Sequence, residues 1–334
     1  MSIESDNYLF IGPQFNSYHE AITQSLIEKG NVVKFVPEKK TGMMFDLLFK
    51  YLPLLHYKLQ KYLLVKRIKS LGVGDFTHLF IIRGEFVDSE VINQLKARYN
   101  FLHFVSYQWD SVLNNKMALT HKQQGFDIFS FDRKDCSKYS FTYLPLFYIY
   151  EQTKVISNNV IYDLSFVGVY SDARLDIFSK LLTQLKMKNI KYKVMFKISP
   201  MLFLYKYCSN PTFRNIDFSY FTFFSIKYND VLVLMNQSKA ILDICHASQS
   251  GLTMRSIESI GLNKKLITNN AIITQEPFFT ESMVYVFQDN SINDLSFINT
   301  KSCSYYNKND YSLTNWLDKM LGDDEVRKGK PSVG

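Results

Sequence analysis

Short runs of apolar residues alternate with longer amphipathic stretches along this chain, and the alternation predicts an α/β fold. Short apolar runs indicate buried strands, whereas apolar residues three and four positions apart indicate helices. Strands and helices that alternate in this way favour a parallel sheet covered by helices on both faces. In the first half we expect strands at 8–11, 32–36, 78–82, 101–107 and 128–131, and helices at 18–29, 89–99 and about 113–123.

The same pattern starts again after 148–159, a polar segment without periodicity that we interpret as a linker. A chain of 334 residues also suits two domains of about 150 residues each. We therefore predict two Rossmann-like, doubly wound domains, 1–150 and 151–334, with a final helix at 313–320 that could pack back on the first domain. Ligands of such sheets bind at the carboxyl ends of the strands, so the two domains would face a central cleft. Further strands are expected at 164–167, 193–196, 240–244, 265–268 and 283–287, and further helices at 173–186, 231–237 and 252–260.

The stretch 240–270 carries the clearest candidate site, because an apolar strand leads through a polar, glycine-containing loop into a helix. Free backbone N–H groups and the dipole at a helix start favour phosphate. Arg255 and Glu258 lie one turn apart and share a helix face. Arg255 could hold a diphosphate and Glu258 could accept hydrogen bonds from ribose hydroxyls, so the expected ligand is a nucleotide sugar. The other candidate donor-binding residues belong to this loop and helix or follow a strand: Arg174, Lys197, His246, Gln249, Ser250, Gly251 and Thr253.

These additional donor-site candidates also have plainer interpretations. Arg174 and Lys197 could be solvated surface charges, and His246 could be a buried structural histidine.

Polar side chains also follow the strands of the first half, at the edge where an acceptor would bind. Asp110 could act as a general base on an acceptor hydroxyl, and the neighbouring Trp109 ring could stack on a sugar face. Asp110 could instead cap the helix that follows it, and an ion pair between Arg83 and Glu85 could be purely structural. The remaining candidates follow the first and third strands: His19 and Glu20 for base catalysis, and Arg83 and Glu85 for acceptor binding, with Glu85 as a further candidate base.

Residues 43–70 form a basic segment in which Leu, Phe and Tyr recur at helical spacing among lysines, and Pro53 divides it into two pieces. An apolar face with an excess of cations suits a helix that lies on an anionic membrane surface. An ordinary pair of helices packed on the first sheet accounts for the same pattern, and both interpretations can hold together.

The charge and the cysteines limit the class of protein. The net charge is +8 and the isoelectric point about 9.0, which suits acidic partners such as nucleotide phosphates or anionic lipid. The basic residues are spread out and no known nucleic-acid-binding motif occurs, so we expect no nucleic-acid partner. Four widely spaced cysteines argue against a zinc site or a disulfide framework. We find no signal peptide and no apolar run of the roughly 18 to 20 residues that span a membrane, so we expect a cytoplasmic protein, or one at the inner face of the plasma membrane.

Common cofactor motifs are missing from the sequence. It contains no GxxxxGK[ST] motif and therefore no P-loop, and no GxGxxG follows the first strand, which argues against a nicotinamide cofactor. No Asp-x-Asp triplet follows a strand, so a metal-bridged diphosphate is not expected. We predict no metal and no cofactor besides the nucleotide-sugar co-substrate.

The sequence resembles bacterial GT-B glycosyltransferases, in particular the CgeB-like or group 1 type of capsule and lipopolysaccharide biosynthesis. The resemblance is carried by LDICHASQSGLTMRSIESIGLNKKLITNN at 242–270 and by FIIRGEF, YQWDS and DLSFVG at other strand ends. It implies a GT-B fold and the transfer of a sugar from a nucleotide sugar to a glycan or lipid-linked acceptor. Glu258 matches the second of two glutamates that retaining members often carry, and Ser250 stands where the first would be. Whether the anomeric configuration is retained therefore stays open. The identity of the donor nucleotide also stays open, and CMP is one of the alternatives.

Two other functions fit the same residues. A nucleotide-sugar epimerase of the same two-domain build would need no acceptor. A non-catalytic protein that binds a nucleotide sugar or a membrane glycolipid would not need Asp110.

Overall fold

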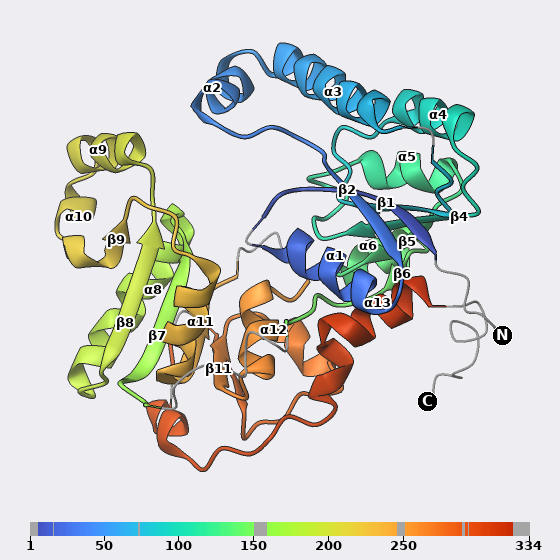
Figure 1. Ribbon diagram of the computed structural model, residues 1–334. Helices are drawn as coiled ribbons and strands as arrows, with labels where there is room; N and C mark the ends of the chain where they lie inside the picture. The colour runs from blue at the N-terminus through green and yellow to red at the C-terminus, as the bar shows by residue number, and fades with distance from the viewer. Residues whose placement is uncertain are drawn as a thin grey trace. The chain divides into compact units, whose positions relative to one another are not determined.

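The chain folds into two compact α/β units (Figure 1). The computed structural model describes residues 6–15, 17–72, 74–149, 159–245, 251–288, 291–292 and 294–322. The first unit comprises residues 1–145 with 313–334, and the second comprises residues 146–312. Each contains a parallel sheet of six strands.

The sheet of the first unit has the strand order β2-β1-β3-β4-β5-β6. Its strands are β1 Asn7–Gly12, β2 Val32–Pro37, β3 His78–Ile82, β4 His103–Gln108, β5 Asp127–Ser130 and β6 Thr142–Tyr143. Its helices are α1 Tyr18–Glu28, α2 Met43–Tyr51, α3 Pro53–Ser70, α4 Ser89–Arg98, α5 Met117–Gln123, α6 Arg133–Tyr139 and α13 Leu313–Leu321.

Both faces of this sheet are buried, which explains the continuous apolar runs of its central strands. Leu79 and Ile81 of β3 pack with residues of α3 and α4 in one core cluster. Phe80 points to the opposite face, where its ring centroid lies 6.5 Å from that of Trp316 on α13. A helix from the end of the chain therefore covers one face of the first sheet.

The sheet of the second unit has the strand order β12-β11-β10-β7-β8-β9. Its strands are β7 Tyr162–Val169, β8 Tyr192–Lys197, β9 Phe221–Thr222, β10 Ser238–Asp243, β11 Lys265–Thr268 and β12 Val284–Val286. Its helices are α8 Asp172–Met187, α9 Pro200–Ser209, α10 Pro211–Arg214, α11 Tyr228–Asn236 and α12 Met254–Gly261, with short 3-10 turns η1 Phe218–Tyr220, η2 Ala271–Gln275, η3 Leu295–Asn299 and η4 Lys308–Tyr311.

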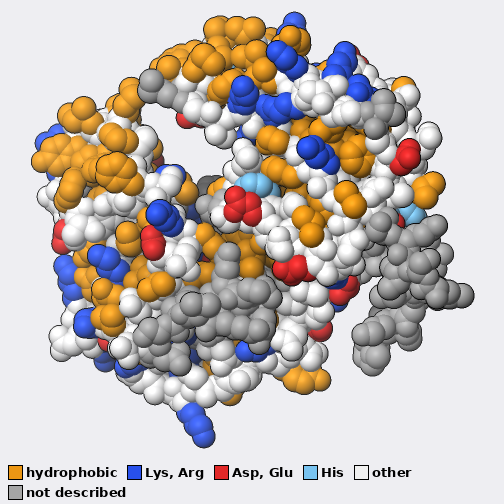
Figure 2. All heavy atoms as spheres, viewed as in Figure 1, with side chains coloured by type: hydrophobic (Ala, Val, Ile, Leu, Met, Phe, Trp, Pro, Cys, Tyr) orange, Lys and Arg blue, Asp and Glu red, His pale blue; other side chains and the backbone are white. Residues whose placement is uncertain are grey.

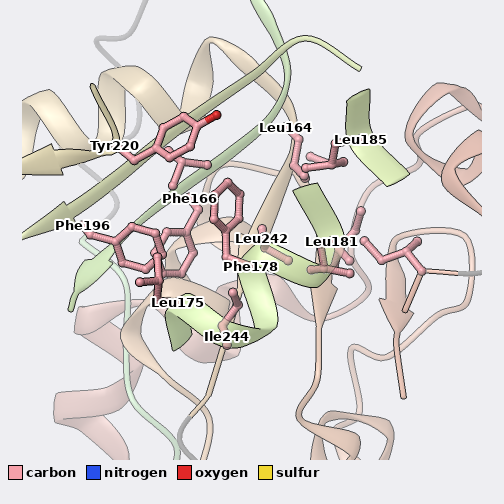
Figure 3. Packing of buried hydrophobic residues seen from close by; sticks show 14 of the residues in the cluster. Leu164, Phe166, Leu175, Phe178, Leu181, Leu185, Phe196, Tyr220, Leu242 and Ile244 are labelled. Atoms are coloured by element: carbon pink, nitrogen blue, oxygen red, sulfur yellow. The ribbon is translucent and has the colours of Figure 1, made fainter. Parts of the chain in front are cut away.

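The core of the second unit forms where α8 lies on the sheet (Figure 3). Phe178 and Leu181 of α8 are buried against Phe166 of β7, Phe196 of β8 and Leu242 of β10. The buried residues of α8 recur every three to four positions, so one face of the helix enters the core and the other stays in solvent. The hydroxyl of Ser171 caps the start of α8 by accepting a hydrogen bond from the Arg174 N–H.

The two doubly wound sheets confirm the predicted α/β class, and most of the expected elements are present. One helix begins later than expected: α5 starts at Met117, because a turn closed by hydrogen bonds to the Ser111 carbonyl occupies the preceding residues. Asp110 therefore does not cap this helix. Among the helices of the described residues, none combines the length and apolar character needed to cross a membrane.

Pro53 divides segment 43–70 into α2 and α3, as predicted. On α3, His56, Gln60, Leu64 and Ile68 recur every four residues and are buried, so this helix packs on the first unit. The packed-helix interpretation is thus correct for α3 from His56 onward. By contrast, several large apolar side chains of α2 and of the first turn of α3 are exposed: Met44, Leu47, Phe49, Tyr51, Leu54 and Leu55.

Candidate functional site

Arg83 lies at the centre of a charged cluster at the carboxyl ends of β3 and β4. Its Nη2 is 3.0 Å from a carboxylate oxygen of Glu85, and its Nε is 3.0 Å from one of Asp110. Lys39 adds a second cation, 3.8 Å from Glu85. The structure thus brings together three of the residues that the strand-end pattern selected. The carboxylate of Asp110, the candidate base, is engaged by Arg83.

The turn after β3 has an unusual backbone that presents Arg83. Arg83 and Gly84 are both left-handed, with φ of 65° and 64°. A Cβ on Gly84 would lie 2.5 Å from the His121 ring and 2.6 Å from Ile81, so glycine is required. The Asn115 amide donates to the Arg83 carbonyl at 2.7 Å and fixes the turn. A left-handed arginine costs on the order of 1 kcal/mol or more, and such strain is concentrated at functional sites.

Glu38, which the sequence analysis did not select, completes this cluster from the end of β2. Its side chain is fully buried, and one carboxylate oxygen accepts a hydrogen bond from the Glu85 N–H at 2.9 Å. The other oxygen, Oε1, has no hydrogen-bond partner among the described residues. Burial raises the pKa of Glu38 to about 7, against the opposing effect of Arg83. This carboxyl group can therefore take up or release a proton near neutral pH.

His19 and Glu20 begin α1, and their side chains form a weaker pair. His19 Nε2 is 3.9 Å from Glu20, whose carboxylate is mostly exposed. Burial lowers the pKa of His19 below its usual value, so the imidazole is neutral at neutral pH. Its Nδ1 is buried without a hydrogen-bond partner in the described part of the chain, and its ring packs 4.8 Å from that of Phe35. Trp109, the predicted stacking residue, is half-buried, and its ring meets that of Phe15 in a T-shaped contact with 6.4 Å between centroids.

In the second unit, a buried aspartate occupies the start of α12. Asp243, the last residue of β10, accepts hydrogen bonds from the hydroxyls of Thr253 at 2.9 Å and Ser256 at 2.7 Å. Thr253 is also the N-cap, since its hydroxyl accepts from the Ser256 N–H at 3.1 Å. The Thr253 hydroxyl, a predicted donor-binding group, is therefore used to join the helix to the strand. A carboxylate at this position is stabilised by the helix dipole.

Arg255 and Glu258 share one face of α12, as predicted, and bind each other at 2.8 Å. Glu258 is buried and Arg255 is half-buried. The second contact of Arg255 Nη1 is the sulfur of Met235, at 3.1 Å. Arg255 Nε is buried without a hydrogen-bond partner among the residues described, so the guanidinium keeps a donor for another group. The roles predicted for both residues toward a nucleotide stay predictions.

Two asparagines that follow β11 hold the ends of the glycine-containing loop. The Asn269 side chain accepts from the Cys245 N–H at 2.8 Å, and the Asn270 amide donates to the Gly251 carbonyl at 3.1 Å. Neither asparagine was among the predicted site residues. Three predicted donor-site residues, His246, Gln249 and Ser250, lie between these anchors and outside the described residues.

The other two predicted cations of the second unit, Arg174 and Lys197, lie at the carboxyl edge of its sheet. Arg174 donates to the carbonyls of Ile244 at 2.9 Å and Val169 at 3.1 Å, so it joins the ends of β10 and β7. Lys197 ends β8 and donates to the Ser225 hydroxyl at 2.6 Å. Of the two, Lys197 has the more exposed side chain and can reorient toward an anion.

Comparison with known proteins identifies the fold. No protein-family model and no curated protein sequence matches the chain. Among solved structures, the UDP-N-acetylglucosamine 2-epimerase of Rickettsia bellii matches with a TM-score of 0.56 at 8% identity, over 95% of this chain and 99% of that one. Anabaena HepE, solved with UDP and glucose, matches with a TM-score of 0.54 at 9% identity, over 88% of this chain and 89% of that one. The UDP-GlcNAc 2-epimerase of Methanocaldococcus jannaschii, solved with UDP-GlcNAc and UDP, matches with a TM-score of 0.51 at 9% identity, over 95% of this chain and 93% of that one.

The chain has the GT-B fold. This confirms the predicted pair of Rossmann-like domains. At these identities the similarity extends to the fold alone, so a place in the CgeB-like group and a role in capsule or lipopolysaccharide synthesis stay predictions. The described residues of this GT-B chain contain no group of three or more His, Cys, Asp or Glu side chains that could hold a metal ion.

Proposed function

We propose that the protein is a glycosyltransferase that moves a sugar from a nucleotide sugar, with UDP as the favoured nucleotide, to a glycan or lipid-linked acceptor. The observation that carries the proposal is the Arg83 cluster on a GT-B fold, where Asp110 and Glu38 provide carboxylates at the ends of strands of one sheet. UDP is favoured because HepE and the M. jannaschii epimerase were solved with it. We propose a bacterial surface polysaccharide, such as capsule, lipopolysaccharide or O-antigen, as the product.

In this proposal the first unit binds the acceptor. Asp110 takes the proton of the acceptor hydroxyl as that oxygen bonds to the anomeric carbon of the donor sugar. Arg83 and Glu85 hold further hydroxyls, and Trp109 stacks on the sugar ring. Burial raises the pKa of Glu38 to about 7, so this carboxyl group is partly protonated near neutral pH, which limits the negative charge around Arg83.

The second unit binds the donor in this proposal. Arg255 Nε and the Lys197 ammonium neutralise the diphosphate, which leaves with the electron pair of the broken anomeric C–O bond. Glu258 accepts hydrogen bonds from ribose, and the loop held by Asn269 and Asn270 contacts the phosphates. No metal is required for the leaving group.

An epimerase is the second candidate, because two of the three solved structures above are UDP-N-acetylglucosamine 2-epimerases. Such an enzyme would invert a carbon of the donor sugar without any acceptor. The acceptor requirement therefore separates the two functions.

Turnover of a panel of UDP, GDP, CMP and TDP sugars, followed by NMR with and without acceptor glycans, tests the proposal. A transferase releases nucleotide only when the acceptor is present, and we expect this activity to persist in EDTA. Asp110→Asn should lower turnover roughly 100-fold or more, whereas exposed Asp75→Asn should not. Epimerised donor without acceptor would favour the second candidate. Binding without any turnover would indicate a non-catalytic protein, and activity lost in EDTA but restored by Mn²⁺ would refute the metal-free mechanism.

We further propose that α2 and the first turn of α3 dock the enzyme on an anionic membrane, where a lipid-linked acceptor would lie. Phe49 is 61% and Leu54 80% exposed, and Lys50 and Lys58 accompany them. Apolar side chains among lysines suit the boundary between headgroups and acyl chains. Phe49→Ser with Leu54→Ser should lower binding to phosphatidylglycerol vesicles in a sedimentation assay; equal binding by the variant and the wild type would contradict this role.

A further inference from the structure

Helix α9 of the second unit presents a second exposed apolar surface, which the sequence pattern did not reveal. None of the ten residues of α9, all of them described, is buried. Met201 is 80%, Leu204 63% and Tyr205 64% exposed. Figure 2 shows hydrophobic side chains gathered over α9. Contiguous apolar surface of this kind usually contacts a partner or a membrane.

The helix that carries this surface is firmly held. Its inward side chain, Phe203, packs against the rings of Phe213, Phe221 and Phe223, each at 5.3 Å between centroids. At the start of α9, the Ser199 hydroxyl accepts from the Leu202 N–H at 3.3 Å. The exposed residues therefore project from a fixed helix with its own aromatic base.

Further polar contacts fix the rest of α9. Lys206 pairs with Asp172 of α8 at 2.7 Å. Arg214 donates to the carbonyls of Tyr207 and Cys208 at the helix end, at 2.7 and 2.8 Å. These contacts hold α9 on the second unit with Met201, Leu204 and Tyr205 on its exposed face.

The charged residues around α9 favour an anionic partner. Between positions 197 and 217 the sequence has three cations, Lys197, Lys206 and Arg214, and one acid, Asp217. Asp172 pairs with Lys206, so the segment keeps an excess of one positive charge. A symmetric contact between two copies would set two positively charged surfaces against each other, whereas an anionic lipid surface attracts such a surface. Tyr and Phe side chains also favour the interface between lipid and water.

We propose that the exposed face of α9, comprising Met201, Leu204 and Tyr205, docks on an anionic lipid bilayer. The helix lies in the interface and does not cross it. The second unit then has a membrane contact of its own, in addition to the one proposed for α2 and α3. This inference goes beyond the proposed function, because it does not depend on transferase chemistry.

Sedimentation with vesicles of phosphatidylcholine, with and without phosphatidylglycerol, tests this contact on the full chain. We expect Met201→Ser/Leu204→Ser/Tyr205→Ser to lower the partition coefficient for the anionic vesicles about tenfold or more, because three apolar side chains no longer enter the interface. Leu102→Ser/Met187→Ser/Tyr306→Ser, which removes side chains that are 72%, 77% and 73% exposed, is the matched control and should leave the partition coefficient unchanged. Combining the α9 variant with Phe49→Ser/Leu54→Ser should lower the partition coefficient for the anionic vesicles further.

Wild-type binding by the α9 variant would overturn the proposal. So would a wild-type dimer that becomes a monomer in the α9 variant with no change in vesicle binding, since that result makes the face a contact between copies. Circular dichroism checks that the variant is folded, and its UDP-sugar affinity should equal that of the wild type. A protein without transferase activity that still needs α9 for vesicle binding would refute the proposed function and leave this contact standing.

Discussion

Glu38 links the candidate site to stability through a single proton. A glutamate exposed to water has a pKa of 4.5, and burial raises the pKa of Glu38 to about 7 in the folded protein. Between these values the folded state holds a proton that the unfolded chain has released, so the free energy of unfolding falls as the pH rises. One pKa unit corresponds to about 1.4 kcal/mol, which makes the full effect about 3 kcal/mol. The contribution is complete below the lower pKa and is lost as the pH rises through the higher one.

Glu38→Gln should remove this pH dependence, because the amide keeps the shape of a protonated carboxyl group and does not titrate. We expect the unfolding free energy of the variant, minus that of the wild type, to increase by about 2 to 3 kcal/mol between about pH 5 and pH 8. Urea unfolding at several pH values measures the difference. The exposed Glu281→Gln serves as control and should give a constant difference. A constant difference for Glu38→Gln would mean that the buried carboxyl titrates normally.

The residues that sequence alone identified, and those it missed, differ in a physical way. Arg83 and Glu85 were found because they directly follow an apolar strand. Glu38 also follows a strand, but its burial and its contact with the Glu85 N–H arise only in the folded chain. Asp243 ends an apolar run, and its importance comes from Thr253 and Ser256, ten and thirteen residues later. Contacts of this kind depend on the tertiary fold, which a local pattern does not contain.

At the scale of elements, α12 provides the test of the donor site. Glu258→Gln keeps the size of the side chain but removes the negative charge that binds Arg255 and, in our proposal, ribose. We expect UDP affinity to fall about tenfold and stability to fall by about 1 to 3 kcal/mol, since the ion pair is largely buried. Calorimetry with UDP and urea unfolding measure the two effects.

An exposed ion pair on α8 supplies the control for the Glu258→Gln prediction on α12. Asp176 and Lys180 also form an ion pair at 2.7 Å, but both are exposed. Asp176→Asn should therefore change UDP affinity and stability very little. Unchanged UDP affinity in Glu258→Gln would remove Glu258 from the donor site, even if the variant is less stable.

Periodicity predicted elements well where one face is buried and poorly where it is not. The helix α8 was expected at 173–186 and runs from Asp172 to Met187, because its apolar residues follow the helical repeat. The helix α9 was missed because PMLFLYKYCS is apolar on most sides and has no such repeat. Its helical form depends on Ser199 and Pro200 at the start and on the ring cluster around Phe203. That missed helix carries the proposed second membrane contact.

At the scale of the whole molecule, the end of the chain returns to the unit where the chain began. Helix α13 belongs to the first unit, although the second unit separates it in sequence from the rest. Trp316 is buried there, and its ring centroid lies 4.7 Å from that of Tyr107 on β4. Lys29, after α1, pairs with Asp318 of α13. The first sheet therefore depends on residues that the second unit separates from it in sequence.

Trp316→Ala should destabilise the first unit in preference to the second. Removing a buried tryptophan leaves a cavity between α13 and the sheet, and such changes cost about 3 to 5 kcal/mol. Hydrogen exchange followed by mass spectrometry measures the effect locally: peptides from β3 and β4 should lose protection, while peptides from β7 and β10 keep it. Tyr306→Ala, which changes a side chain that is 73% exposed, should leave both units as protected as in the wild type. Equal loss of protection in β3 and β10 would contradict a local role for Trp316, because the two units would then unfold as one cooperative body.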